Sequence, residues 1–140
     1  MTPPTIHPTS DQFERLAGST SDAPIVMLNL LRFKDVADGV DEADGISGEE
    51  AYQRYGAAVA SNLAEAGGTV LTMATCSETV IGPADERWDL CLLVRYPSRA
   101  AFLRMVSDPD YLAKNEHRTA GVDDSRLICC EQLEGTPLVT

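Results

Sequence analysis

The sequence has no long apolar segment and few positive charges. No apolar run approaches the roughly 20 residues that a membrane-spanning helix needs. The opening MTPPTIHPTSDQ lacks the basic start and the apolar stretch of a secretory signal. Eleven Lys and Arg residues face 22 Asp and Glu residues, and the formal charge of −11 would repel a phosphate backbone. We therefore expect a cytoplasmic protein with no membrane and no nucleic-acid partner.

Motifs of cofactor and metal chemistry are also missing. The sequence contains no glycine-rich phosphate loop, no G-x-S-x-G and no H-E-x-x-H. Its four cysteines form no C-x-x-C pair, and the adjacent Cys129 and Cys130 would point to opposite faces of a strand. We expect reduced, mostly buried thiols at Cys76, Cys91, Cys129 and Cys130, with a zinc site or a redox pair as the alternative. No cofactor and no metal are expected.

What is present describes one globular domain. The chain has 140 residues, of which 44% are hydrophobic and 24% charged, enough to bury a core without disulfides. We divide it into an N-terminal extension with a short helix at 1–24, a domain at 25–133 and a tail at 134–140. The run IVMLNLL at 25–31 is apolar on both faces, which is typical of a strand covered on both sides.

Segments rich in β-branched residues alternate with segments of helical spacing. Thr9 opens the short helix of the N-terminal extension, and Ser or Asp opens each later one, because a side-chain oxygen can bond the free N–H groups there. Strands are expected at 25–31, 69–81, 88–96 and 125–133, and helices after Ser47, Ser98 and Asp108. The order strand, helix, strand, strand, helix, strand predicts an α+β fold of the ferredoxin-like βαββαβ type, an antiparallel sheet with its helices on one face.

The expected fold leaves one face of the sheet without helices. Since several strands are apolar on both faces and the helices cover only one, the other face needs a partner, and a second copy of the chain is the simplest one.

The acidic loop at 34–46 places Asp at every third position, which does not match a calcium loop, so we expect it to be solvated.

The stretch from AYQRYGAAVASNLAEAGGTVL to WDLCLLVRYPSRAAFLRMVSDPDYLAKNEHR resembles the family known as Domain of Unknown Function 1330, within the dimeric α/β-barrel superfamily. The resemblance rests on Tyr52 and Tyr55 before EAGGTVL, on RYPS at 95–98, and on Phe102 followed by SDPDY. It covers roughly residues 25–133. It implies a dimer in which two sheets face each other and each sheet forms a cleft with its own helices. Relatives by fold include cofactor-free monooxygenases, lactone isomerases and haem-binding enzymes, so the fold alone selects no activity.

His117 is the candidate catalytic residue. It is the only interior side chain whose usual pKa lies near neutrality, as a general acid or base requires. Arg118 beside it is a fixed cation suited to a carboxylate or an enolate. The alternative is that both residues only cap the free carbonyls at the end of their helix.

Four more polar residues are candidates for substrate binding. Asn29 interrupts an apolar strand, so it either braces a loop or faces a polar cavity. Tyr111 stands seven positions before Arg118, on the same helical face, with its phenol either in a cleft or at the rim of the core. Asp89 and Arg95 share one side of a strand, where they either line a cavity or serve solvation alone.

We thus expect a small-molecule-binding homodimer. Its candidate chemistry is cofactor-independent proton transfer or oxygenation of a small anionic or carbonyl compound. The alternative is a non-catalytic ligand-sensing or interaction module of the same fold, in which the same residues only cap and brace.

Overall fold

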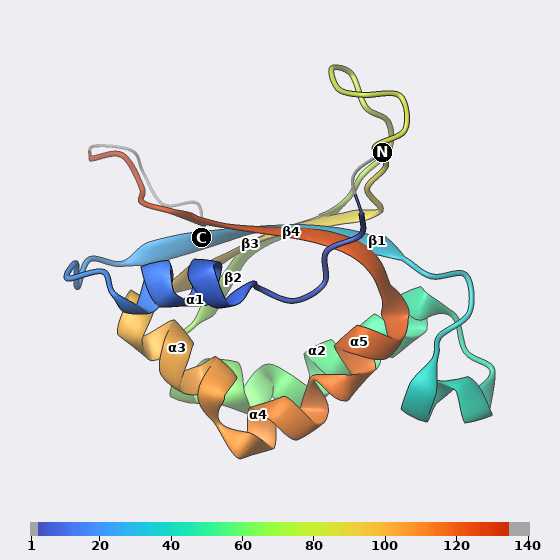
Figure 1. Ribbon diagram of the computed structural model, residues 1–140, viewed down its shortest axis with the longest axis horizontal. Helices are drawn as coiled ribbons and strands as arrows, with labels where there is room; N and C mark the ends of the chain where they lie inside the picture. Colours follow the sequence, from blue (N-terminus) through green and yellow to red (C-terminus); the bar gives the residue numbers. More distant parts are fainter. Residues whose placement is uncertain (1–2, 135–140) are drawn as a thin grey trace.

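A computed structural model describes residues 3–134 and shows a four-stranded sheet above a layer of helices (Figure 1). The strands are β1 (Ile25–Phe33), β2 (Thr69–Thr75), β3 (Leu90–Tyr96) and β4 (Val122–Cys130). They lie in the order β2-β3-β1-β4, and every neighbouring pair is antiparallel. This is the predicted ferredoxin-like arrangement.

The helices begin where the capping residues predict. They are α1 (Ser10–Ala17), the 3-10 helix η1 (Gly39–Asp44), α2 (Gly48–Glu65), α3 (Arg99–Ser107), α4 (Pro109–Lys114) and α5 (Glu116–Gly121). The Ser47 hydroxyl accepts the Glu50 N–H at 3.1 Å, and Ser98 and Asp108 cap α3 and α4 in the same way. Among residues 3–134, no helix is long and apolar enough to span a bilayer.

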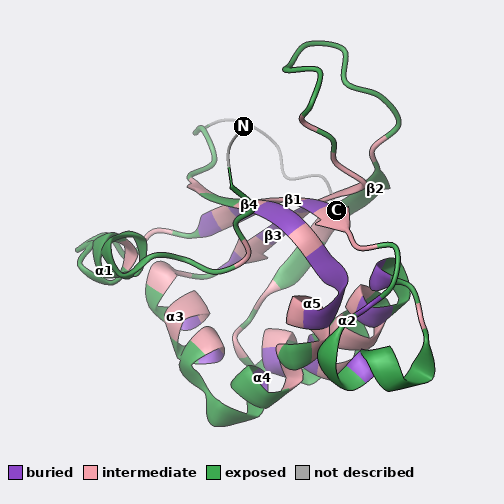
Figure 2. Cartoon of the chain, turned by 45° about the vertical axis from the view of Figure 1, so that its right-hand side comes forward, coloured by how far each residue is buried: buried purple, intermediate pink, exposed green. Residues whose placement is uncertain are grey.

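The core lies between the sheet and the helices. Alternate residues of β1, Ile25, Met27 and Leu31, are 2% exposed or less, and Leu92 and Val94 of β3 face the same side. In Figure 2 the buried residues follow the strands and the inner sides of α2 and α5. The N-terminal extension joins this core, because Ile6 and Leu16 pack against it.

Two glycines bring α2 against the end of α5. A Cβ on Gly48 would overlap the carbonyl oxygens of Lys34 and Gly121, and a Cβ on Gly121 would overlap the Gly48 carbonyl. The Gly48 N–H donates to the Lys34 carbonyl at 3.0 Å, and the Lys34 N–H donates to the Gly121 carbonyl at 2.9 Å. The absence of side chains here lets three backbone segments bond directly.

The sheet face away from the helices is apolar in its middle. On this uncovered face the intervening residues of β1 and β3 and one residue of β4 form the apolar area: Val26, Leu28, Leu30, Leu93 and Ile128. Ile128 is 52% exposed and the others are half-buried. One end of this face is charged, with Arg32 and Arg126 beside Asp124. β4 starts three residues before its expected position, and this early part carries the charge.

The β2–β3 connection is longer than predicted. β2 ends at Thr75 rather than at residue 81. Just beyond it the Cys76 N–H donates to the Asp89 carbonyl at 3.0 Å, and on the other edge the Asp89 N–H donates to the Leu31 carbonyl at 2.7 Å. Residues 77–87 form an arm that rises from the sheet on the side opposite the helices (Figures 1 and 2). Near its tip, Val80 and Ile81 are 89% and 95% exposed.

Most residues of the acidic loop are exposed, as expected, but two of them are buried. Asp41 in η1 and Ala37 before it are each 1% exposed. The Ala37 N–H donates to Ile46 and the Asp38 N–H donates to Ala120, both at 2.9 Å. The loop is therefore bonded to the body of the protein through its backbone.

Candidate functional site

All four tyrosines of the chain gather on the helix-facing side of the sheet. Tyr52 and Tyr55 come from α2, Tyr96 from the end of β3 and Tyr111 from α4. The hydroxyls of Tyr55 and Tyr111 lie 2.5 Å apart, and the Tyr52 and Tyr55 ring centroids are 5.4 Å apart. We call these four residues the tyrosine cluster.

Three phenols of the cluster, Tyr52, Tyr55 and Tyr96, have raised pKa values. Burial raises the pKa of Tyr52 to about 12, against a smaller opposing effect of the Arg118 charge. Burial also raises the pKa of Tyr96 and of Tyr55, and the neighbouring Tyr111 adds to both increases. Because Tyr52, Tyr55 and Tyr96 keep their protons at neutral pH, these three residues offer hydrogen-bond donors rather than a general base.

Arg118 supplies a positive charge beside this cluster. Its Nη1 donates to the Ile6 carbonyl at 2.7 Å and its Nη2 to the Ser125 hydroxyl at 3.3 Å. Its charge acts on both Tyr52 and Tyr55. The guanidinium thus bonds the N-terminal extension and β4 rather than carbonyls of its own helix, and it brings a cation to the tyrosines.

Asn29 lies in a row of residues that crosses the helix-facing side of the sheet. The strand register aligns Met73, Leu92, Asn29 and Leu127 as this central row. Met73 at one edge is 56% exposed and Leu127 at the other edge is 48% exposed, so the helices leave both ends of the row open to solvent. The Asn29 amide donates to the Met27 carbonyl at 3.2 Å.

Several polar atoms on this side have no protein partner. In the described part of the chain, no hydrogen bond is made by the Tyr52 hydroxyl, the Tyr96 hydroxyl or the Asn29 Oδ1. None of them is among the buried atoms left without a partner, so solvent reaches each one. These atoms are free to bond a ligand in place of water.

His117 takes its partner from the acidic loop. Its Nδ1 lies 2.8 Å from an Asp41 carboxylate oxygen, and the other oxygen accepts from Arg54 at 3.1 Å. The His117 side chain is 32% exposed. The imidazole is therefore oriented by a buried carboxylate, and its Nε2 bonds no other residue from 3 to 134. His117 and Arg118 are consecutive in α5, yet they bond different elements.

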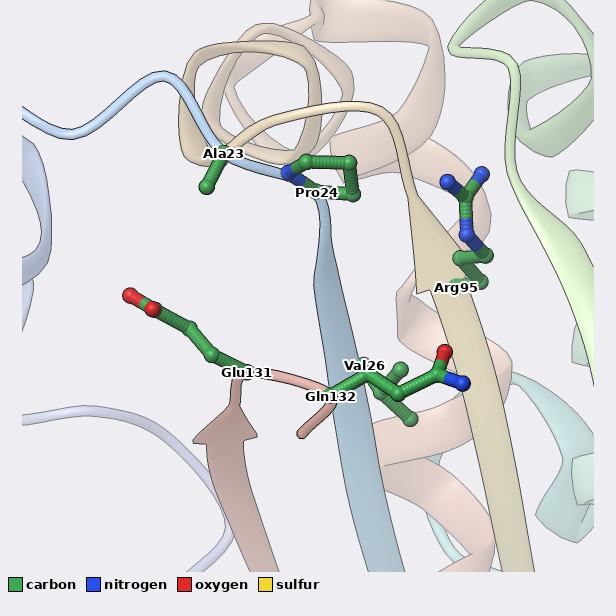
Figure 3. Close-up of a pocket in the computed structure, with 6 residues that line it drawn as sticks. All are labelled: Ala23, Pro24, Val26, Arg95, Glu131 and Gln132. Atoms are coloured by element: carbon green, nitrogen blue, oxygen red, sulfur yellow. The ribbon is translucent and has the colours of Figure 1, made fainter. Parts of the chain in front are cut away.

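Asp89 and Arg95 lie away from the tyrosines, at opposite ends of β3 on the uncovered face. The Asp89 carboxylate accepts the Phe33 N–H and an Arg87 N–H, both at 2.8 Å. Arg95 lines a shallow pocket of about 200 Å³ (Figure 3). The other residues of this pocket are Ala23, Pro24, Val26, Glu131 and Gln132. Arg95 makes no hydrogen bond or ion pair with any residue from 3 to 134.

The cysteines remain free thiols, and each is half-buried. Burial raises the pKa of Cys76 and of Cys129, which keeps both thiols protonated and weakly nucleophilic at neutral pH. The described residues contain no group of His, Cys, Asp and Glu placed to hold a metal ion.

Of the candidate residues named from the sequence, Asn29, Tyr111 and Arg118 lie on the helix-facing side. Tyr52, Tyr55 and Tyr96 lie beside them but were not named as candidates. Tyr52 and Tyr55 follow the spacing of an apolar helical stripe and therefore look like core residues. Tyr96 ends an apolar strand.

The comparisons with known proteins agree with the geometry of the fold. A family model described as a domain of unknown function (DUF1330) matches residues 42–133. The solved structure of RPA0582, a protein of unknown function from Rhodopseudomonas palustris, is 38% identical, with a TM-score of 0.85 over 92% of this chain and 97% of that one. No protein of curated function matches the sequence.

More distant structures share the fold alone. A dimeric protein of unknown function with a ferredoxin-like fold from Bacteroides fragilis is 11% identical, with a TM-score of 0.50 over 78% of this chain and 96% of that one. A dabb family protein with a ferredoxin-like fold from Mesorhizobium loti is 15% identical, with a TM-score of 0.52 over 79% and 97%.

Proposed function

This chain belongs to the family described as a domain of unknown function (DUF1330), and we propose from its own side chains that it is a homodimer that binds a small organic molecule. The binding site lies between the central row of the sheet and the tyrosine cluster. Asn29, Tyr111 and Arg118 are the predicted residues of this site, and Tyr52, Tyr55 and Tyr96 join them.

The observation that carries this proposal is the set of unpartnered polar atoms. The Tyr52 and Tyr96 hydroxyls and the Asn29 oxygen are reached by solvent in an otherwise apolar interior. A protein gains nothing in stability by leaving such groups without partners. A ligand that bonds them would replace water at these positions and would be oriented by them.

The chemistry of the site favours an anionic or carbonyl ligand. Neutral phenols donate hydrogen bonds, and Arg118 adds a positive charge, so an oxygen that carries negative charge is matched by both. Leu92 and the tyrosine rings offer apolar surface to the remainder of the molecule. A small carboxylate, quinone or lactone combines these two properties.

Cofactor-independent proton transfer or oxygenation is the proposed reaction, with His117 as the acid or base. Asp41 orients the imidazole through Nδ1, as a carboxylate does for many general bases. Nε2 must then reach a ligand bound beside Arg118, the next residue. His117→Gln is expected to abolish turnover while the ligand still binds. Unchanged turnover would leave His117 a bracing residue and favour a ligand sensor.

The homodimer is proposed because the uncovered face is apolar. Leu28, Leu30 and Leu93 lie on it without a covering element from residues 3–134. Sheets pack face to face at about 10 Å through such surfaces. Arg95 and Asp89 stand at the two ends of this face, so we assign them to the interface instead of the tyrosine site.

Thermal-shift measurements with small carboxylates, quinones and lactones test the binding site. A ligand that binds only the folded protein raises Tm. We expect this shift to be lost in Tyr52→Phe and in Arg118→Gln, and kept in Arg104→Gln, which removes an exposed cation from the last turn of α3. Equal shifts in all three variants would place the ligand elsewhere, and no shift with any compound would contradict the proposed ligand class.

A further inference from the structure

We propose that the arm at residues 77–87 docks on a second copy of the chain, in the pocket that contains Arg95. This inference rests on the homodimer proposed above and adds to it which parts of the two subunits meet. In such a dimer each subunit gives its arm to the partner and receives the partner's arm.

The arm presents apolar side chains that its own subunit does not cover. Val80 and Ile81 are adjacent, are 89% and 95% exposed, and precede the Gly82–Pro83 turn. Neighbouring β-branched side chains exposed to this extent are unfavourable on a lone subunit and typical of a contact with another surface. The arm also extends past the uncovered face, on the side where a second sheet would pack (Figure 1).

The pocket is complementary to this arm. Ala23, Pro24 and Val26 give it an apolar wall, and Arg95 gives it a cation that has no partner among residues 3–134 (Figure 3). Glu131 does not neutralise that cation, because its carboxylate pairs with Arg99 at 2.9 Å. The arm carries three carboxylates, at Glu78, Asp85 and Glu86, and one cation, Arg87 at its base, which bonds Asp89 at 2.8 Å. An acidic, apolar-tipped arm thus fits a basic, apolar-walled pocket.

The register of the sheet determines where a partner's arm would lie. Thr69, where β2 begins, pairs with Arg95, whereas Thr75, where β2 ends and the arm follows, pairs with Leu90. The pocket and the arm therefore stand at opposite ends of the same sheet. If the twofold axis lies between the two sheets and is perpendicular to the strands, the arm of each copy comes to the pocket end of the other.

The length of the arm is sufficient for this contact. Each leg has about five residues and can span up to roughly 16 Å at about 3.3 Å per residue. Face-to-face sheets are separated by about 10 Å. The tip can therefore pass the gap between the sheets and reach the pocket at the end of the partner's sheet.

Charge favours this arrangement over the dimer whose twofold axis is parallel to the strands. With the axis parallel to the strands, Arg95 would face the partner's Arg95, and the two arms would meet at the same end. Like charges at an interface are unfavourable when both are desolvated. With the axis perpendicular to the strands, each Arg95 instead meets the carboxylates of the partner's arm.

Photo-cross-linking tests the contact directly. A benzophenone amino acid at position 81 is irradiated in the purified protein, and cross-linked peptides are mapped by mass spectrometry. We expect a covalent dimer whose cross-links reach residues 23–26, 95 or 131–132 of the other subunit. The same photoreactive residue in place of Val36, which is 58% exposed in the acidic loop, serves as the control and should give no covalent dimer.

A second measurement does not depend on cross-linking. The combined variant Val80→Ser and Ile81→Ser is expected to raise the Kd of the dimer about ten-fold or more, whereas Val36→Ser leaves it unchanged. A dimer of unaltered Kd, or cross-links from arm to arm, would overturn the docked arm and leave the dimer standing. A monomer of the unmodified protein would overturn both proposals.

Discussion

At the scale of single residues, Asp41 anchors the acidic loop to the rest of the protein. Its carboxylate is 1% exposed and accepts hydrogen bonds from His117 of α5 and Arg54 of α2. A buried carboxylate is tolerated only when both oxygens have partners. This one charged side chain therefore adds to the backbone hydrogen bonds that hold the loop, and it also orients the proposed acid or base.

Asp41→Ala should lower the free energy of unfolding by about 2 kcal/mol, because it removes two hydrogen bonds that involve ionisable groups. Asp44 offers a matched control, since it bonds the same Arg54 at 2.6 Å but is 53% exposed. Asp44→Ala should change the free energy by less than about 0.5 kcal/mol. Urea unfolding of the two variants measures the difference, and equal effects would contradict the anchoring role of Asp41.

The raised pKa of Tyr52 predicts how the free energy of unfolding changes at high pH. Its pKa is raised from 10.0 to about 12 in the folded protein, so the unfolded chain loses this proton first as the pH rises. The stability that the neutral phenol contributes is complete below pH 10.0 and is lost between pH 10.0 and about 12. Urea midpoints across this range should fall less steeply for Tyr52→Phe than for the unmodified protein. If the urea midpoints of the two proteins fell equally over this pH range, the proposed effect of Tyr52 would be contradicted.

At the scale of elements, α2 and the α5–β4 junction approach each other closely through their backbones. Neither Gly48 nor Gly121 has space for a Cβ. The backbone of Lys34 bonds both residues, since its carbonyl accepts the Gly48 N–H and its N–H donates to the Gly121 carbonyl. Because the obstructing atoms belong to backbone, they cannot rotate away from a new side chain. The position of α5, and with it of His117 and Arg118, depends on this contact.

Gly48→Ala and Gly121→Ala should each destabilise the protein by roughly 3 kcal/mol or more, as overpacking against backbone does. Gly56→Ala is the control, because Gly56 lies inside α2 and a Cβ there would meet no atom within 4 Å. That variant should stabilise the protein by about 0.5–1 kcal/mol, since alanine favours the helix. Thermal unfolding separates these outcomes, and a tolerated Gly48→Ala would show that the two elements can move apart.

Local patterns predicted most of the elements. The Thr9, Ser47 and Ser98 caps stand where helices begin, since a cap depends on residues three positions apart. The end of β2 was predicted six residues too late. The helix η1 was not predicted, because it depends on residues distant in the sequence: Asp41 bonds Arg54 of α2 and His117 of α5.

The site was harder to predict than the fold. Asn29 is visible in the sequence as a polar residue in an apolar strand, and Arg118 as a cation near a helix end. Tyr52 and Tyr55 have the spacing of core residues, so only their neighbours in space show that one hydroxyl is paired and the other free. Arg95 and Asp89 share a strand side, but their distance from the tyrosines depends on which face the helices cover.

At the scale of the whole molecule, the two faces of the sheet differ in what covers them. The helices and the tyrosine cluster cover one face, while Leu28, Leu30 and Leu93 occupy the other without cover from the described chain. The apolar middle, the unpartnered Arg95 and the extended arm all lie on this second face or beside it. A second copy accounts for the three features together.

Sedimentation equilibrium at micromolar concentration is the most direct test of this central claim. The account predicts a species of twice the chain mass of 15.1 kDa, with dissociation on Leu28→Glu, which places a charge in the middle of the uncovered face. A single species of 15.1 kDa for the unmodified protein would contradict it.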